Sequence, residues 1–134
     1  MESELFFAPI GPDLFSTFED LRSREPIFHR VSFGTSLEDF ERMMAPDYFE
    51  IGASGRRYDR EFILRHLAQN PPIDADVAGW VCSEFGLKQL CLDTFLLTYR
   101  LDQCGRVSQR ATIWQSTLTG WQIVFHQGTI VTEK

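Results

Sequence analysis

The hydrophobic pattern changes its period near Trp80, and this change constrains the fold more than any other feature of the sequence. Before Trp80, apolar residues recur every three or four positions, as they do along one side of a helix. After Trp80 they alternate with polar residues, as they do in a strand with one buried face. Helices followed by strands indicate an α+β domain, in which the helices cover one face of a curved antiparallel sheet.

Three helices are predicted before the change of period. They cover residues 13–24, 36–45 and 59–69. Each begins at a residue that can cap free helical amides: Asp13, Ser36 with Asp39, and Asp59. Prolines interrupt or end the helical pattern after each one. A short hairpin is predicted between the second and third helices, with strands at Tyr48–Ile51 and Arg56–Tyr58.

Four strands are predicted after Trp80. They cover Val81–Cys91, Thr94–Leu101, Arg106–Gln115 and Trp121–Gln127. Their connections are short enough for hairpins, so the strands are expected to pair in sequence order and antiparallel. Loops of four residues place Leu101 opposite Arg106 and Ser116 opposite Trp121. This register decides which side chains share a face of the sheet.

One face of the predicted sheet is strongly aromatic and is expected to lie under the helices. In this register it carries Phe95, Leu97, Tyr99, Arg110, Thr112, Trp114, Ile123, Phe125 and Gln127. An apolar wall with a few converging polar groups is typical of a small-molecule pocket. Ligand contacts are predicted for Tyr99, Arg110, Trp114, Phe125 and Gln127, and for Tyr48 in the short hairpin. In the alternative interpretation, Arg110 pairs with a carboxylate at the sheet rim and Tyr99 reaches water.

The opposite face mixes polar and apolar residues and is predicted to form a homodimer interface. It carries His126, Gln115 and Gln122 in this register. His126 is the one histidine on a predicted strand. A hydrogen-bonded structural role at the interface is favoured for it over acid–base chemistry.

Glu50 is the candidate for acid–base chemistry. A carboxylate among aromatic residues has its pKa raised toward neutrality, which suits a general base. The alternative is an ion pair with Arg110, Arg57 or Arg56 that fixes the short hairpin, because a buried charge normally requires a partner.

Charge and cysteine content exclude several classes of protein. The formal charge of −6 and the pI near 5.0 do not suit a nucleic-acid groove, which needs clustered Lys and Arg. Three cysteines without a C-x-x-C pair predict neither a disulfide framework nor a metal site, and no cofactor is predicted. Without a signal-peptide pattern or an apolar run of spanning length, a cytoplasmic protein that does not bind membranes is expected.

Two stretches resemble the nuclear transport factor 2-like superfamily, which includes ketosteroid isomerase and the SnoaL-like polyketide cyclases. The first runs from Ala45 to Asp59. The second contains Arg110–Trp114 and the closing W-x-x-x-F-H-Q-G-T motif, Trp121–Thr129. Both look like a bacterial branch of unknown function. The resemblance covers residues 13–131. It implies a cone-shaped fold with a pocket at its wide end, in a homodimer packed through the sheet.

The resemblance leaves the function open. We expect an N-terminal arm over residues 1–12 and a single domain over 13–134. In ketosteroid isomerase a strand carboxylate moves the proton, and a tyrosine with a protonated acid holds the oxyanion. Glu50 falls near the position of that base, but the other two groups are missing, so steroid isomerisation is not supported.

Three functions remain. The first is a protein that binds a small apolar or amphipathic molecule in a pocket between helices and sheet. The second is an enzyme of isomerase, cyclase or dehydratase type with Glu50 as general base. The third is a protein-interaction module that uses its sheet face.

Overall fold

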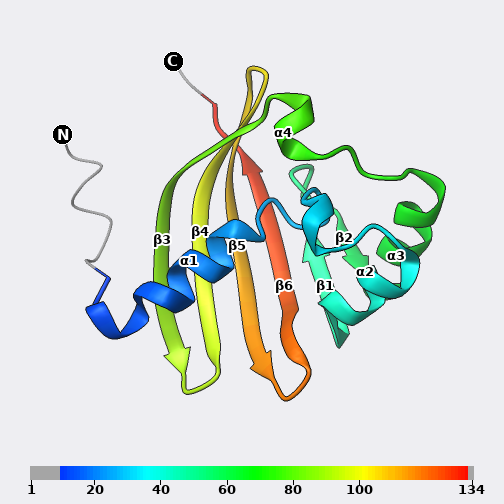
Figure 1. Cartoon of the computed structure of the whole chain (residues 1–134). Coiled ribbons are helices and arrows are strands. Elements are labelled where there is room, and N and C mark those ends of the chain that lie inside the picture. Colours follow the sequence, from blue (N-terminus) through cyan, green and yellow to red (C-terminus); the bar gives the residue numbers. More distant parts are fainter. Residues whose placement is uncertain (1–9, 133–134) are drawn as a thin grey trace.

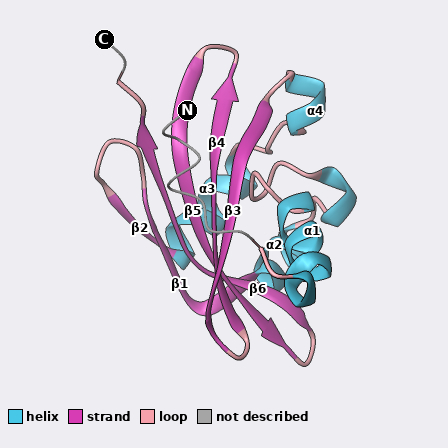
Figure 2. Cartoon of the chain, turned by 90° about the vertical axis from the view of Figure 1, so that its left-hand side faces the viewer, coloured by secondary structure: helices cyan, strands magenta, loops and turns pink. Residues whose placement is uncertain are grey.

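A sheet of six strands forms one layer of the molecule, and the helices lie over one of its faces (Figures 1 and 2). The computed structural model describes residues 10–132, so residues 1–9 of the predicted arm lie outside the described part. The strands are β1 (Met44–Ile51), β2 (Arg57–Asp59), β3 (Val81–Cys91), β4 (Thr94–Gln103), β5 (Arg106–Thr117) and β6 (Gly120–Ile130). The helices are α1 (Phe15–Ser23), α2 (Leu37–Met43), α3 (Arg60–Gln69) and α4 (Ala75–Ala78), with 3₁₀ turns at Pro12–Leu14 and Val31–Phe33. The predicted α+β class is confirmed.

The sheet is mixed rather than wholly antiparallel as predicted. Its order is β2-β1-β6-β5-β4-β3, and β3 to β6 form the predicted antiparallel meander. β1 pairs with β6 in parallel. It follows α2 without a loop, since α2 ends at Met43 and β1 begins at Met44. Pro46 was expected to end the helix but lies inside β1. It falls at a register shift between Met44 and Phe49, where a missing N–H is tolerated.

Two of the three predicted helix caps are present. Ser36 and Asp39 form a capping box at α2, and Asp59 caps α3. The predicted cap at Asp13 is wrong, because Asp13 lies in a 3₁₀ turn and α1 begins after that turn without a side-chain cap. The short helix α4 was not predicted.

The β4–β5 connection is shorter than predicted. Gln103 pairs with Arg106, so Leu101 lies opposite Ser108 instead of Arg106. The error is a shift of two residues, which leaves every side chain of β5 on its predicted face.

An extra residue in β6 changes the register within the β5–β6 pair. β6 begins in the predicted register. Farther along, the consecutive residues Trp114 and Ile113 pair with Ile123 and Phe125. Val124 is left without a partner on β5, which is the geometry of a β-bulge.

The bulge makes three predicted face assignments wrong. His126 was predicted on the outer face, but it turns toward the helices and is 4% exposed. Phe125 and Gln127, which flank it, turn to the outer face instead of the pocket face. Gln115 and Gln122 precede the bulge and pair with each other on the outer face, as predicted.

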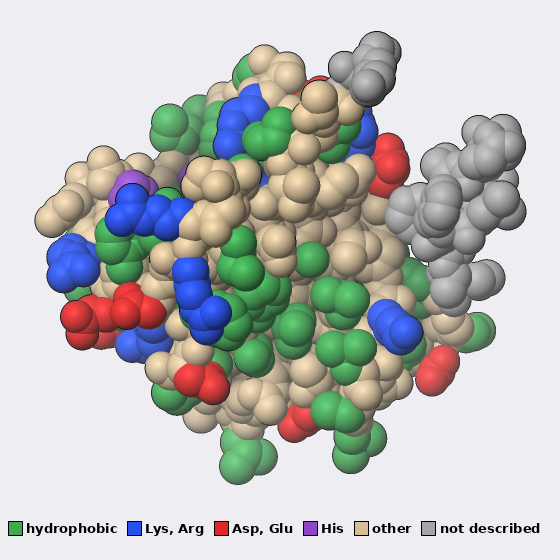
Figure 3. Space-filling model, turned by 180° about the vertical axis from the view of Figure 1, so that it is seen from behind, with side chains coloured by type: hydrophobic (Ala, Val, Ile, Leu, Met, Phe, Trp, Pro, Cys, Tyr) green, Lys and Arg blue, Asp and Glu red, His purple; other side chains and the backbone are tan. Residues whose placement is uncertain are grey.

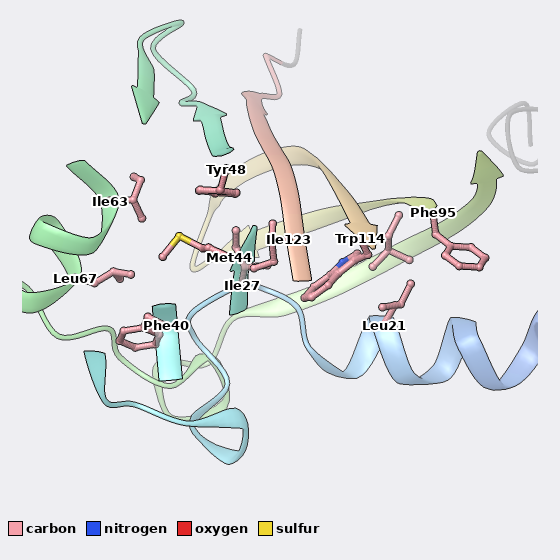
Figure 4. Close-up of a cluster of buried hydrophobic side chains, with 11 residues drawn as sticks. Leu21, Ile27, Phe40, Met44, Tyr48, Ile63, Leu67, Phe95, Trp114 and Ile123 are labelled. Atoms are coloured by element: carbon pink, nitrogen blue, oxygen red, sulfur yellow. The ribbon is translucent and has the colours of Figure 1, made fainter. Parts of the chain in front are cut away.

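The core fills the space between the helices and the sheet (Figure 4). Its buried side chains are Leu21, Ile27, Phe40, Met44, Tyr48, Ile63, Leu67, Phe95, Leu97, Trp114 and Ile123. They come from both layers, so burial of this cluster holds the helices on the sheet. The face of the sheet under the helices is called the inner face below.

Candidate functional site

A pocket with a volume of about 190 Å³ lies between α3, the segment Ile27–His29 and the inner face of the sheet. Ile27, Phe28, Ile63 and Leu67 form its apolar wall. Its polar side chains are His29, Glu50, His66, Asn70, Arg110 and His126. Two of them, Glu50 and Arg110, were predicted to serve a pocket. The three histidines and Asn70 were not.

A row of cross-strand neighbours brings Glu50 and His126 together. Glu50 in β1 pairs with His126 in β6, and His126 pairs with Thr112 in β5. Paired residues on adjacent strands lie side by side on the same face. The carboxyl, the imidazole and the hydroxyl therefore follow one another across the inner face.

Glu50 is half-buried, and Tyr48 holds one of its oxygens. The Tyr48 hydroxyl donates a hydrogen bond of 2.6 Å to Oε1 of Glu50. Burial raises the pKa of Glu50, while this hydrogen bond and the charges of Arg110 and His66 act in the opposite direction. A raised pKa is what a carboxyl base that works near neutral pH requires.

No ion pair joins Glu50 to an arginine within residues 10–132, so the predicted alternative role is not found there. The two arginines of the short hairpin contact rings instead. Arg57 lies 4.3 Å from the centre of the Phe49 ring, and Arg56 lies 5.8 Å from that of Tyr58.

Arg110 extends from β5 toward its neighbour β6, where Gly128 gives it room. A Cβ added to Gly128 would lie 3.1 Å from Nε of Arg110, which is tighter than ordinary contact. Nε donates to Oγ of Ser108 at 2.9 Å, and Nη1 lies 3.4 Å from Nε2 of His126. Nη2 donates to Oε1 of Gln103 at 3.5 Å. All three partners are uncharged or neutral groups, and none of the ion pairs in the described part involves Arg110.

His126 has a partner on each ring nitrogen. Nδ1 lies 2.7 Å from Oγ1 of Thr112, and Nε2 faces Arg110. Burial lowers the pKa of His126 to about 3, and the charge of Arg110 acts in the same direction. The imidazole is therefore neutral at physiological pH.

Glu25 is a fully buried carboxyl that was not predicted from the sequence. The Tyr99 hydroxyl donates to its Oε1 at 2.7 Å, and Nε1 of Trp114 donates to its Oε2 at 3.1 Å. The Ile27 amide donates to Oε1 at 3.2 Å, and Thr112 is a fourth partner. Burial raises the pKa of Glu25, and these four hydrogen bonds lower it. In the sequence Glu25 reads as an ordinary charge at the end of a helix, followed by proline, so no pattern marks it.

Four of the six predicted ligand contacts lie away from the pocket. Tyr99 and Trp114 face inward as predicted, but they are buried against Glu25. Trp114 also lines a separate cavity of about 50 Å³. Phe125 and Gln127 lie on the outer face because of the bulge in β6.

Of the other two predicted contacts, Arg110 lines the pocket. Tyr48 is a buried core residue outside the pocket lining, and its hydroxyl holds Glu50, which does line the pocket. Within residues 10–132, no group of His, Cys, Asp and Glu is placed to hold a metal ion. None of the helices in that range has the length and apolar character to cross a bilayer.

No family model and no curated protein matches the sequence. Solved structures match over most of the chain. One is an NTF2-like protein from Cytophaga hutchinsonii, with a TM-score of 0.64 and 13% sequence identity. The match covers 92% of this chain and 100% of that protein. An NTF2-like protein of unknown function in nutrient uptake, from Rhodospirillum rubrum, has a TM-score of 0.58 and 16% sequence identity. The match covers 88% of this chain and 98% of that protein. A cystatin-like fold protein from Burkholderia xenovorans has a TM-score of 0.68 and 12% sequence identity. The match covers 92% of this chain and 95% of that protein.

The buried, neutral His126 makes stability depend on pH. Its pKa is about 3 in the folded protein against an ordinary value of 6.5, so between these values the unfolded chain binds a proton that the folded chain does not. The free energy of unfolding is expected to fall as pH is lowered from about 6.5 to about 3, by up to about 1.4 kcal/mol per pH unit from this group. The pKa values of Glu25 and Glu50 are raised in the folded protein, so their contributions to the free energy of unfolding increase as pH is lowered, opposite to that of His126.

Urea unfolding at a series of pH values measures this effect. His126→Asn is expected to lose stability less steeply than the wild type over this range, and His66→Asn, which changes an exposed histidine, is the matched control. Equal slopes for His126→Asn and the wild type would show that His126 is not held neutral by the fold.

Proposed function

We propose that this protein, which has the nuclear transport factor 2-like fold, binds a small organic anion with an apolar body in the pocket beside α3. The observation that carries the proposal is that Arg110 lines the pocket without an ion pair in the described part of the chain. Its guanidinium lies at the pocket, and its partners there are the neutral groups of Ser108, His126 and Gln103. A partly buried cation without a carboxylate contact is completed by an anionic ligand.

A carboxylate is the anion that suits this cation best. The guanidinium is a planar fork of N–H donors that matches the two oxygens of a carboxylate. The neutral His126 beside it adds no second positive charge. The site therefore offers one guanidinium to one carboxylate of the ligand.

The apolar wall and the volume limit the rest of the ligand. Ile27, Phe28, Ile63 and Leu67 offer hydrocarbon and aromatic surface. An engineered apolar cavity of about 150 Å³ binds benzene. A pocket of about 190 Å³ has room for one ring or a short branched chain attached to the carboxylate.

Benzoate is a suitable probe of this proposal, with benzamide as its uncharged counterpart. We expect calorimetric titration to show binding of benzoate in preference to benzamide. Arg110→Met removes the charge and keeps an apolar side chain, and it should weaken benzoate binding at least about tenfold, since truncating a buried charge pair costs about 2–5 kcal/mol. Arg106→Met, at an exposed position of the same strand, is the matched control. Equal affinity of Arg110→Met and the wild type, or a preference for benzamide, would contradict the proposal.

A second candidate function is proton transfer, and the environment of Glu50 favours it. Glu50 lines the same pocket, burial raises its pKa, and Tyr48 orients it through Oε1. A ligand carbonyl held by Arg110 would place an adjacent C–H bond near this base. Glu50 would take the proton, and the electron pair of the C–H bond would become an enolate whose oxygen the guanidinium stabilises. Isomerases, cyclases and dehydratases commonly begin with this step.

Phenylpyruvate tests this function because it joins a carboxylate to a ketone with acidic benzylic protons. Exchange of these protons with deuterium is followed by NMR. The wild type should accelerate the exchange, with a rate that increases as pH rises through the pKa of Glu50. Glu50→Gln should abolish the acceleration with little change in melting temperature, because Tyr48 can still donate to the amide oxygen. Glu61→Gln, at an exposed position on α3, is the control. An undiminished rate in Glu50→Gln would rule out this residue as the base.

A homodimer through the outer face is a further part of the proposal. Half-buried apolar side chains form one row across four strands of this face: Leu96, Ile113, Phe125 and Phe49. Hydrophobic side chains gather over the back of the molecule (Figure 3). A sheet face exposed to water would carry polar side chains in such a row, so a second copy of the same face is the partner that fits.

The dimer is checked by light scattering at micromolar concentration. A dimer mass is expected for the wild type, and Phe125→Glu, which places a charge in the centre of the row, should give the monomer mass. A monomer mass for the wild type would contradict the dimer.

A further inference from the structure

Four side chains form a chain of contacts from the buried carboxyl of Glu25 to the guanidinium at the pocket. Glu25 and Thr112 are hydrogen-bonded to each other. Oγ1 of Thr112 lies 2.7 Å from Nδ1 of His126, and Nε2 of His126 lies 3.4 Å from Nη1 of Arg110. None of these residues except Arg110 was expected to serve the pocket, and the pocket functions proposed above make no use of Glu25.

The donors around Glu25 decide the direction of the hydrogen bonds. The Trp114 indole and the Ile27 amide can only donate, and the Tyr99 hydroxyl donates to the same carboxyl. The bond with Thr112 lowers the pKa of Glu25, as a hydrogen bond donated to a carboxylate does, so Thr112 is a donor to it as well. A hydroxyl has a single proton, so once Thr112 donates it to Glu25, its oxygen is left to accept from His126. The proton of the neutral imidazole is therefore on Nδ1.

The contact at the other end of the ring requires the same tautomer. A guanidinium has donors and no acceptor, so Nη1 of Arg110 needs a lone pair on Nε2 of His126. With the proton on Nδ1, Nε2 carries that lone pair. The two ends of the ring thus agree independently.

We infer that Glu25 is a positioning residue for Arg110: through Thr112 it fixes the tautomer of His126, and the lone pair on Nε2 then holds the guanidinium at the pocket. Gly128 supplies the space that this orientation needs. The imidazole gives its one proton to Thr112 and its lone pair to Arg110, so it offers no donor to a ligand. The guanidinium is left as the group that recognises the anion.

The functional part of this inference rests on the proposed function, but the tautomer does not. ¹⁵N-detected NMR of the histidine rings in the ligand-free wild type reports which nitrogen carries the proton. We expect Nδ1–H for His126. An Nε2–H tautomer would overturn the inference whether or not any ligand binds.

Arg110→Met separates the two ends of the chain. This variant removes the donor to Nε2 and leaves Glu25 and Thr112 in place. If Glu25 acts through Thr112, His126 keeps the Nδ1–H tautomer in this variant. If Arg110 alone sets the tautomer, the ring should shift toward Nε2–H, the form that an isolated imidazole side chain favours, and the role of Glu25 would be refuted.

Two substitutions of Thr112 test the consequence for the pocket. Thr112→Val keeps the shape and removes the hydroxyl, and Thr112→Ser keeps the hydroxyl. Benzoate should bind about tenfold more weakly to Thr112→Val, the effect of about one hydrogen bond, and normally to Thr112→Ser. Equal affinity of Thr112→Val and the wild type would overturn the link to Arg110. If the wild type itself does not bind benzoate, the proposed function fails, and the tautomer measurements still decide whether Glu25 acts through Thr112.

Discussion

A single extra residue in β6 determines which groups the pocket contains. Because Val124 has no partner on β5, His126 and Gly128 turn toward the helices and Phe125 turns away from them. A regular strand would place Phe125 under the helices. The guanidinium of Arg110 would then meet a side chain where it now lies against a glycine. The bulge therefore supplies both the space and the acceptor that hold an arginine beside an apolar wall.

Glu25 shows why the charge of Arg110 stays available at the pocket. A buried carboxyl is tolerated when donors satisfy its oxygens, and four donors surround this one. Two neutral groups, Thr112 and His126, stand between it and the guanidinium. A direct ion pair would satisfy both charges and close the site. The intervening neutral groups fix the direction of the arginine without pairing it with a carboxylate.

The sequence was sufficient for the fold class but not for the site, and the reasons are physical. The change of period at Trp80 identified the helices and the meander, and an error of two residues in the β4–β5 loop left all faces correct. A bulge shifts the register by one residue, and nothing in the run from Trp121 to Gln127 marks where the extra residue falls. His126 was therefore assigned to the wrong face. Glu25 gave no signal at all, because burial of a charged residue depends on partners from distant strands.

The closing motif acquires a physical meaning once the bulge is included. His126 and Gly128 are two residues apart, so both project to the inner face, one as acceptor and the other as space for Arg110. The neutral state of His126 also matters for Glu50, its neighbour on β1. A protonated imidazole beside Glu50 would pair with the carboxylate and lower its pKa. Because the ring is neutral and both its nitrogens are occupied, Glu50 keeps a raised pKa although the charge of Arg110 acts to lower it. Within residues 10–132 no ion pair joins the two groups, so a base and a cation face the same pocket.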